Sequence, residues 1–134
     1  MGVVNIEEQL IKAGIKPTAQ RIAIFRFLQE EANHPTADDV KIWMDKNFPM
    51  VSLATVYNTL NLFVKAGLLL ELRFPHDDRV VFDMNTQPHH HFLDEQNGEL
   101  IDLDLQQVRV ESNLGDEFQI RETQTILIGQ RKQS

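Results

Sequence analysis

Three histidines and two aspartates are the residues of this 134-residue chain whose types and spacing could bind a metal. His89 and His91 form a His-x-His pair, and alternate residues of a strand place their side chains on one face. Neutral imidazoles combined with carboxylates suit a divalent first-row metal such as Fe(II), Mn(II) or Zn(II). The candidate metal ligands are His34, Asp83, His89, His91 and Asp102.

The place of Asp102 depends on the hairpin that an Asn-Gly turn predicts after His91. A two-residue loop would pair Leu93 with Asp102, and a four-residue loop would pair His91 with Asp102. Both registers put Asp102 on the face of His89 and His91, whereas a three-residue loop would not. Asp104 shares that face and remains a rival ligand.

A simpler interpretation exists for each candidate. A single loop histidine such as His34 is more often a capping or surface residue than a ligand, and an exposed histidine run is often incidental. If all five residues bind one metal, however, that metal would hold two distant parts of the chain in one arrangement. A ligand shifts a conformational equilibrium by binding one state better, so such a site could act as a switch.

The elements that position these residues follow from hydrophobic periodicity and capping residues. Four helices followed by a hairpin is the order of a winged helix-turn-helix. The expected helices span residues 6–13, 17–31, 36–46 and 52–66, and the hairpin strands span 68–74 and 79–82, joined by the turn 75–78.

The second part of the chain predicts a smaller α/β unit. A second hairpin, 89–94 with 99–104, precedes an expected helix at 105–113 and an expected long strand at 117–129. We therefore expect an α+β protein with a winged-helix DNA-binding domain at 1–83, a hinge at 84–88 and a small α/β domain at 89–134.

Composition limits the classes of function. The net charge of −7 argues against a nucleic-acid coat over the whole surface, but residues 1–84 hold 9 of the 13 Lys and Arg residues. A DNA-binding face would thus be local. No apolar run approaches the roughly 18 residues of a membrane span, and no signal peptide precedes the first helix, so we expect a cytoplasmic protein with no membrane partner.

The fourth expected helix has an apolar stripe of Leu53, Val56, Leu60 and Val64. Its polar stripe, on which Leu62 also falls, has the chemistry to read DNA bases. Small or methyl-bearing side chains can contact thymine methyls, an asparagine can pair with adenine, and basic side chains can reach phosphates. A solvated polar helix face is the simpler alternative. The candidate DNA-binding residues are Lys16, Arg21, Ala54, Thr55, Tyr57, Asn58, Lys65 and Arg73, with Arg79 as a further phosphate contact.

Taken together, these motifs resemble the ferric uptake regulator (Fur) family of bacterial metal-dependent repressors. The resemblance covers nearly the whole chain and becomes specific through the order and spacing of its pieces. The pieces are Gly14-Ile15-Lys16-Pro17-Thr18-x-x-Arg21, His34-Pro35-Thr36-Ala37-Asp38-Asp39, Ser52-Leu53-Ala54-Thr55-Val56-Tyr57-Asn58-Thr59-Leu60, Phe82-Asp83, His89-x-His91 and Gly98-Glu99-Leu100-Ile101-Asp102.

The resemblance implies that the α/β domain at 89–134 is a dimerisation domain, and it implies a regulatory metal site at the five candidate ligands. The chain is most similar to the peroxide-sensing (PerR) subgroup, because Asp83 and Asp102 stand where iron sensors usually have Glu. In that subgroup, bound Fe(II) reacts with hydrogen peroxide and ligand histidines are oxidised, which by resemblance are His34 and His91. The oxidised protein then releases metal and DNA.

The chain departs from the family pattern in having no cysteine. Most members have two Cys-x-x-Cys pairs that bind a structural zinc, and Asp94 and Asn97 occupy the positions of the first pair. We therefore expect no such zinc, and a homodimer that depends on packing through Ile120, Ile126 and Ile128. Without thiols, a peroxide response would need iron and histidine, or the less reactive methionine.

The sequence thus predicts a homodimeric repressor, not an enzyme, that binds a pseudo-palindromic operator. One regulatory site per subunit would hold Fe(II) or Mn(II), with Zn(II) possible in vitro. The first alternative is an iron- or manganese-responsive repressor that is insensitive to peroxide. The others are a non-haem iron enzyme, which needs open coordination positions, and a metal-independent winged-helix protein.

Overall fold

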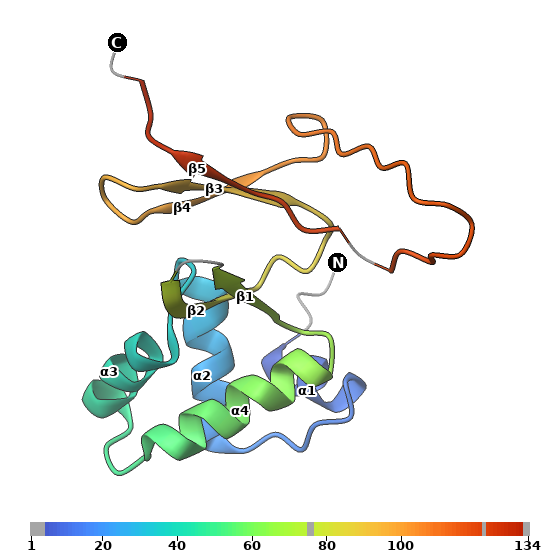
Figure 1. The fold of residues 1–134 in the computed structure, drawn as a ribbon. Coiled ribbons are helices and arrows are strands. Elements are labelled where there is room, and N and C mark those ends of the chain that lie inside the picture. Colours follow the sequence, from blue (N-terminus) through green and yellow to red (C-terminus); the bar gives the residue numbers. More distant parts are fainter. Residues whose placement is uncertain (1–4, 75–76, 122, 133–134) are drawn as a thin grey trace. The chain divides into compact units, whose positions relative to one another are not determined.

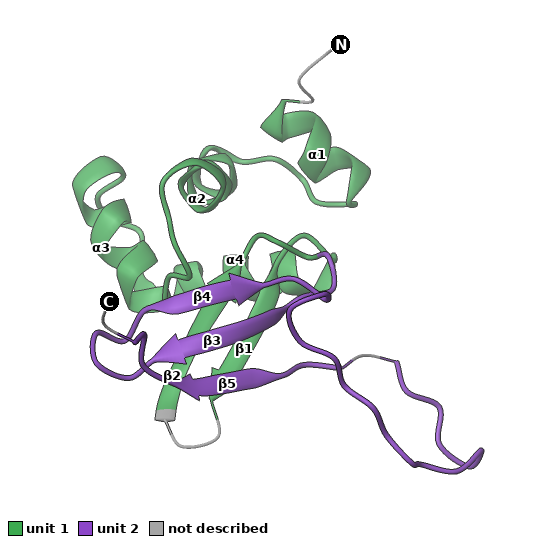
Figure 2. Ribbon diagram, turned by 90° about the horizontal axis from the view of Figure 1, so that it is seen from above, with its two compact units in different colours: residues 1–86 green, residues 87–134 purple. Residues whose placement is uncertain are grey.

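The computed structural model describes residues 5–74, 77–121 and 123–132 (Figure 1). The chain divides into two compact units, residues 1–86 and 87–134, shown in green and purple in Figure 2. In the part of the chain that the structure describes, no helix is both long and apolar enough to cross a membrane.

The four expected helices of the first unit are confirmed. Each begins after a residue whose side-chain oxygen accepts the backbone N–H three positions on, which satisfies one of the free donors of the first turn. The caps are Asn5, Thr18, Thr36 and Ser52, and the helices are α1 (Ile6–Lys12), α2 (Ala19–Glu30), α3 (Ala37–Asn47) and α4 (Leu53–Lys65).

Aromatic contacts join these helices around one apolar core. The rings of Phe25 and Phe63 meet edge to face at 5.4 Å between centroids, linking α2 to α4. Trp43 of α3 stacks on Phe27 of α2 at 4.8 Å. Leu53, expected on the apolar stripe of α4, is instead 37% exposed, because the core is already reached by residues deeper in the helix.

The expected wing follows α4. Strands β1 (Leu70–Phe74) and β2 (Asp77–Asp83) pair antiparallel, which completes the winged helix-turn-helix of the first unit. The guanidinium of Arg79 lies 4.8 Å from the centre of the Phe74 ring. Two residues of the expected turn, Pro75 and His76, lie outside the described residues.

The second unit contains a three-stranded sheet in the order β4-β3-β5. Central β3 (His90–Asp94) pairs antiparallel with β4 (Leu100–Leu103) and parallel with β5 (Ile126–Gly129). The β3–β4 hairpin adopts the four-residue loop, and its register pairs His91 with Asp102.

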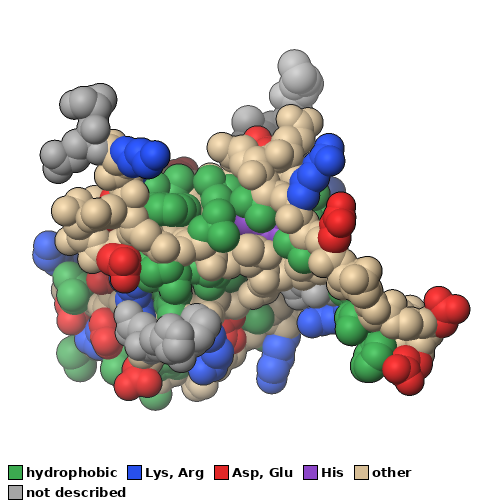
Figure 3. Space-filling view, turned by 45° about the horizontal axis from the view of Figure 1, so that its top comes forward, with side chains coloured by type: hydrophobic (Ala, Val, Ile, Leu, Met, Phe, Trp, Pro, Cys, Tyr) green, Lys and Arg blue, Asp and Glu red, His purple; other side chains and the backbone are tan. Residues whose placement is uncertain are grey.

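Two sequence expectations for this unit are wrong. Residues 105–113 form turns and extended backbone rather than a helix, and the expected strand 117–129 is limited to β5 among its described residues. Both segments expose apolar side chains, including Leu105 at 52% and Phe118 at 56%. A short helix gains most of its stability from a packed apolar face, and the apolar Leu105 and Val110 of the first segment are exposed rather than packed. Figure 3 shows apolar and acidic side chains side by side on this extended arm, at the right of the view.

Candidate metal centre and nucleic-acid interface

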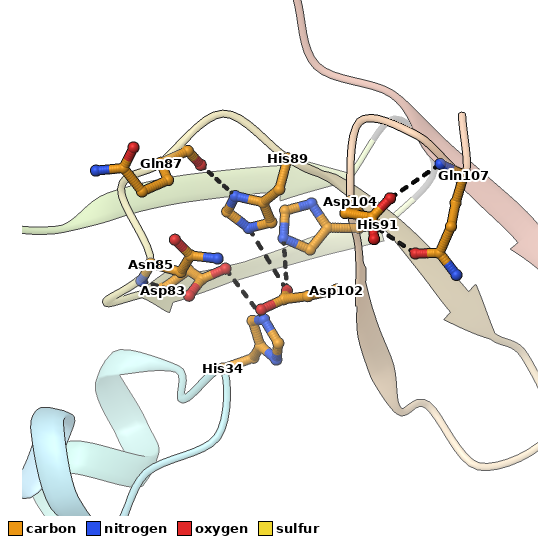
Figure 4. A network of polar contacts seen from close by, with 9 residues as sticks. All are labelled: His34, Asp83, Asn85, Gln87, His89, His91, Asp102, Asp104 and Gln107. Atoms are coloured by element: carbon orange, nitrogen blue, oxygen red, sulfur yellow. Dashed lines mark hydrogen bonds and ion pairs between the residues drawn. The ribbon is translucent and has the colours of Figure 1, made fainter. Parts of the chain in front are cut away.

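The second unit brings three of the candidate ligands together. The Nε2 atoms of His91 and His89 lie 3.2 Å and 3.5 Å from Oδ1 of Asp102. The two imidazole rings are 4.4 Å apart between centroids, and Figure 4 shows both pointing toward the Asp102 carboxylate. The His91–Asp102 register of the hairpin produces this convergence, because paired residues of antiparallel strands share a face.

The orientation of His89 favours its role as a metal ligand. Its Nδ1 lies 2.6 Å from the carbonyl oxygen of Gln87, so Nδ1–H donates to that carbonyl. In a neutral imidazole this leaves the lone pair on Nε2, which faces Asp102. A lone pair and a carboxylate oxygen at this distance repel each other unless a proton or a cation lies with them. Backbone carbonyls orient metal-binding histidines in the same manner.

Asp104, the rival ligand, has another role. Its Oδ1 accepts the backbone N–H groups of Gln106 and Gln107, at 2.9 Å and 3.0 Å. The Gln107 side chain in turn accepts the Asp104 N–H at 2.9 Å, as Figure 4 shows. This carboxylate is used to hold the turn after β4, and the Asp102 carboxylate is the one that meets the histidines.

The first unit brings the other two candidate ligands together. Nε2 of His34 lies 3.2 Å from Oδ2 of Asp83, although the two residues are 49 positions apart in the chain. Asp83 also accepts the backbone N–H of Asn85 at 2.9 Å through Oδ1, which fixes the carboxylate plane. The backbone of His34 is left-handed, with φ of 47°, a conformation that is uncommon for residues other than glycine.

Both donor sets fit a divalent metal of the first transition row. Each consists of imidazole nitrogen and carboxylate oxygen, without thiolate. The second unit offers two imidazoles and one carboxylate from adjacent strands, and the first offers one of each. The side chains of His34, Asp83, His89 and His91 are at most 10% exposed.

Three of the predicted DNA-binding residues line one cavity of the first unit. Arg21, Thr55 and Asn58 border a space of about 210 Å³ between the start of α2 and the polar stripe of α4. Sequence reasoning missed the other lining residues, which are Thr18, Gln20, Thr59 and Leu62. Leu62 is an apolar residue on the polar stripe of α4, and it lines this cavity.

The remaining DNA-binding candidates are exposed on their elements. Ala54, Tyr57 and Lys65 lie on the surface of α4, and Lys16 lies on the surface of the turn before α2. The Lys16 carbonyl accepts Nη1–H of Arg21 at 2.8 Å, so the position of this arginine depends on that turn. On the wing, Arg73 pairs with Glu71 at 2.6 Å, and its charge is partly neutralised.

Comparison with known proteins identifies the family. The model of the ferric uptake regulator family matches residues 12–126. A peroxide-responsive repressor, PerR, of Staphylococcus aureus strain Mu50 is 40% identical over 99 residues. The alignment covers 74% of this chain and 66% of that relative, so the chain spans slightly less than two thirds of the relative's length.

Solved structures agree with this assignment. The ferric uptake regulator of Vibrio cholerae superposes with a TM-score of 0.75 at 28% identity, covering 93% of this chain and 98% of that one. The Pseudomonas aeruginosa ferric uptake regulator with manganese gives 0.74 at 29% identity, covering 98% and 100%. A PerR from Streptococcus pyogenes, described as a peroxide sensor, gives 0.55 at 27%, covering 95% and 88%. The extent of these matches shows that the chain belongs to the ferric uptake regulator family.

Proposed function

We propose that this chain is a metal-dependent transcriptional repressor whose DNA binding responds to hydrogen peroxide through Fe(II). The observation that supports the proposal most strongly is the convergence of His89, His91 and Asp102 in one unit of a ferric uptake regulator family member. The 40% identity to a peroxide-responsive repressor favours peroxide as the signal.

We further propose that one metal ion is held by all five residues, His34, Asp83, His89, His91 and Asp102. Support comes from the two ligand sets, each already gathered within its own unit. A metal that binds both sets would favour one arrangement of the units over the others, by its difference in affinity for the two states. Fe(II), when bound, would supply the one-electron chemistry that makes an oxidant from hydrogen peroxide.

The residues proposed to be oxidised are His34 and His91. Both place an imidazole nitrogen 3.2 Å from a ligand carboxylate, so both rings would lie beside a metal held there. An oxygen added to either ring would make its nitrogen a poorer metal ligand. Metal affinity, and with it DNA binding, would then fall.

The proposed partners are a second copy of this chain and a pseudo-palindromic DNA operator. A winged helix places its last helix in the major groove, and two-fold symmetric dimers bind two half-sites. Exposed apolar residues of the second unit, such as Phe118 and Ile120, support dimerisation by packing in a chain that lacks cysteine. Mn(II) would support DNA binding without the peroxide reaction.

An iron- or manganese-responsive repressor that ignores peroxide is the second candidate function. Its support comes from the similarity to two ferric uptake regulators, at 28% and 29% identity. Both candidates use the same ligands, so the metal site does not separate them.

The deciding experiment follows the oxidation itself. Protein loaded with Fe(II) under anaerobic conditions is treated with hydrogen peroxide, digested and analysed by mass spectrometry, beside a Mn(II)-loaded control. The peroxide-sensing proposal expects one added oxygen on His34 or His91 in the iron sample alone. Unmodified histidines in both samples would leave the metal-responsive repressor as the function. His91→Ala tests the site, since it should abolish the modification at His34 if one metal serves both.

A further inference from the structure

Met50 has no role in the packing of the first unit. It lies in the turn between α3 and α4, two residues before Ser52, the N-cap of the fourth helix, and its side chain is 98% exposed. The other described methionines are covered: Met44 is fully buried and Met84 is partly buried. An apolar side chain this exposed adds nothing to the core.

The backbone at Met50 is strained as well. Its φ is 82°, and Pro49 precedes it, which is the pattern of a type II turn with φ above zero at the third position. Glycine is the usual residue there, since a side chain at positive φ costs on the order of 1–3 kcal/mol. Folding therefore does not explain why this position holds a methionine.

The surroundings of Met50 point to DNA. Leu53 and Tyr57, four residues apart on one face of α4, are 37% and 44% exposed, and Met50 lies in the turn that leads into this helix. The N-terminal residues of a recognition helix are those that contact base edges in the major groove. Apolar side chains there are suited to thymine methyl groups.

Among the methionines that the structure describes, the Met50 thioether is also the accessible soft nucleophile. The chain has no thiol, and oxidation of methionine and cysteine depends on exposure. The sulfur lone pair attacks one oxygen of hydrogen peroxide and the O–O bond breaks. The proton moves to the departing oxygen, giving methionine sulfoxide and water. Sulfur loses two electrons, peroxide gains them, and no metal takes part.

We propose that Met50 is a second peroxide-sensitive position, whose conversion to the sulfoxide weakens DNA binding independently of iron. The sulfoxide replaces an apolar contact with a strong S–O dipole, whose negative oxygen would face bases and phosphates. This inference rests on the proposed DNA binding, but not on the iron chemistry at the histidines. Reduction by a methionine sulfoxide reductase would restore the thioether, so the effect is reversible.

The test uses Mn(II)-loaded full-length protein, in which iron chemistry is absent. Duplexes are first selected from a random-sequence library with the untreated protein, and binding is then followed by fluorescence anisotropy. After peroxide treatment, peptide mass spectrometry should find one added oxygen on Met50 well before Met84. DNA affinity should fall about tenfold, the size of one lost base contact, and return after reductase treatment.

Two matched variants assign the effect to one side chain. Met50→Leu, compared with its own affinity before treatment, should lose no affinity after peroxide, whereas Met84→Leu should lose affinity like the unchanged chain. Met50→Gln, which imitates the polar sulfoxide, should bind about tenfold more weakly without any oxidant.

Two results would overturn the inference while leaving the proposed repressor intact: equal oxidation of Met50 and Met84, or equal loss of affinity in Met50→Leu. If the untreated Mn(II) protein selects no duplex at all, the proposed function and this inference both fail. Mass spectrometry could then still detect oxidation of Met50, but this oxidation would have no effect on DNA binding.

Discussion

The backbone N–H of Phe82 donates a hydrogen bond of 2.9 Å to the carbonyl oxygen of Pro35. Phe82 directly precedes Asp83, and Pro35 directly follows His34. This one bond therefore ties β2 to the loop before α3, next to both candidate ligands. The 3.2 Å contact between His34 and Asp83 is therefore set by main-chain structure. Substituting either side chain should leave that framework in place.

Asp83→Asn should lower metal affinity by at least about tenfold, because even the outer partners of a metal site are worth about 10–100-fold. The amide keeps the size of the carboxylate and can still accept from Asn85 N–H, so the thermal unfolding midpoint should change little. Competition with a metal-binding dye measures the affinity, and Asp78→Asn is the control on the exposed part of the same strand. Equal effects of the two substitutions would remove Asp83 from the ligands.

Asp102 and Asp104 form a matched pair in and just after β4. Asp102→Asn should weaken metal binding by at least about tenfold, since it removes the charge that faces both imidazoles. Asp104→Asn should leave metal affinity nearly unchanged and lower stability by about 1 kcal/mol or less, through weaker hydrogen bonds in the turn. Metal titration and denaturant unfolding of both variants separate these effects. A larger loss of metal affinity in Asp104→Asn would reverse the assignment.

Arg21→Ala should lower the slope of log affinity against log salt concentration by about one, if its guanidinium contacts a DNA phosphate from the cavity beside α4. Arg26, five residues further along α2, is exposed on another face of the helix and provides the control. Binding titrations at several salt concentrations give the slope. An unchanged slope in Arg21→Ala would exclude this arginine from the interface.

Met50→Gly should raise the free energy of unfolding by about 1 kcal/mol, because glycine adopts a φ of 82° without the cost of a side chain. Met50→Ala removes the same long side chain but retains Cβ, so its stability should stay close to that of the unchanged chain. Urea unfolding of the three proteins checks this. A stabilised Met50→Ala would mean that the exposed thioether, rather than the backbone, is the unfavourable feature.

Phe118→Glu should shift the proposed dimer toward monomer, since it places a charge on an apolar side chain that is 56% exposed in the single chain. Ile42→Glu makes the same change at a 57% exposed position of α3 and should leave the assembly as it is. Sedimentation at several protein concentrations reports the mass of both. If the Phe118→Glu variant remains a dimer, Phe118 is not needed for dimerisation, and Ile120 and Ile128 remain as the candidate contacts.

Much of the first unit could be predicted from the sequence because its signals are local. A capping residue, an apolar stripe and a terminal glycine or proline mark each helix, and Thr36 with Asp39 forms the complete capping box. The burial of Leu53 was predicted wrongly because burial does not depend on local signals alone. Its spacing fits the apolar stripe, but burial depends on which other residues reach the core first.

The second unit could be predicted only in part because its structure depends on contacts between distant residues. The parity of the hairpin placed Asp102 with His89 and His91, yet the choice between loops of two and four residues had to come from the structure. The helix expected at 105–113 is absent and its apolar residues Leu105 and Val110 are exposed, because a local pattern does not specify the packing that a short helix needs. The pairing of His34 with Asp83 has no local signal, and only the family resemblance indicated it.

The stacking of Trp43 on Phe27 gives the first unit a fluorescence signal of its own. Trp43 is the only tryptophan of the chain, so fluorescence excited at the red edge of the absorption band comes from α3 alone. Loosening of the helices will change its emission, whereas unfolding confined to the sheet of the second unit will not reach it directly. A change in tryptophan emission on adding metal would thus report that the surroundings of α3 have changed. This helix begins three residues after His34.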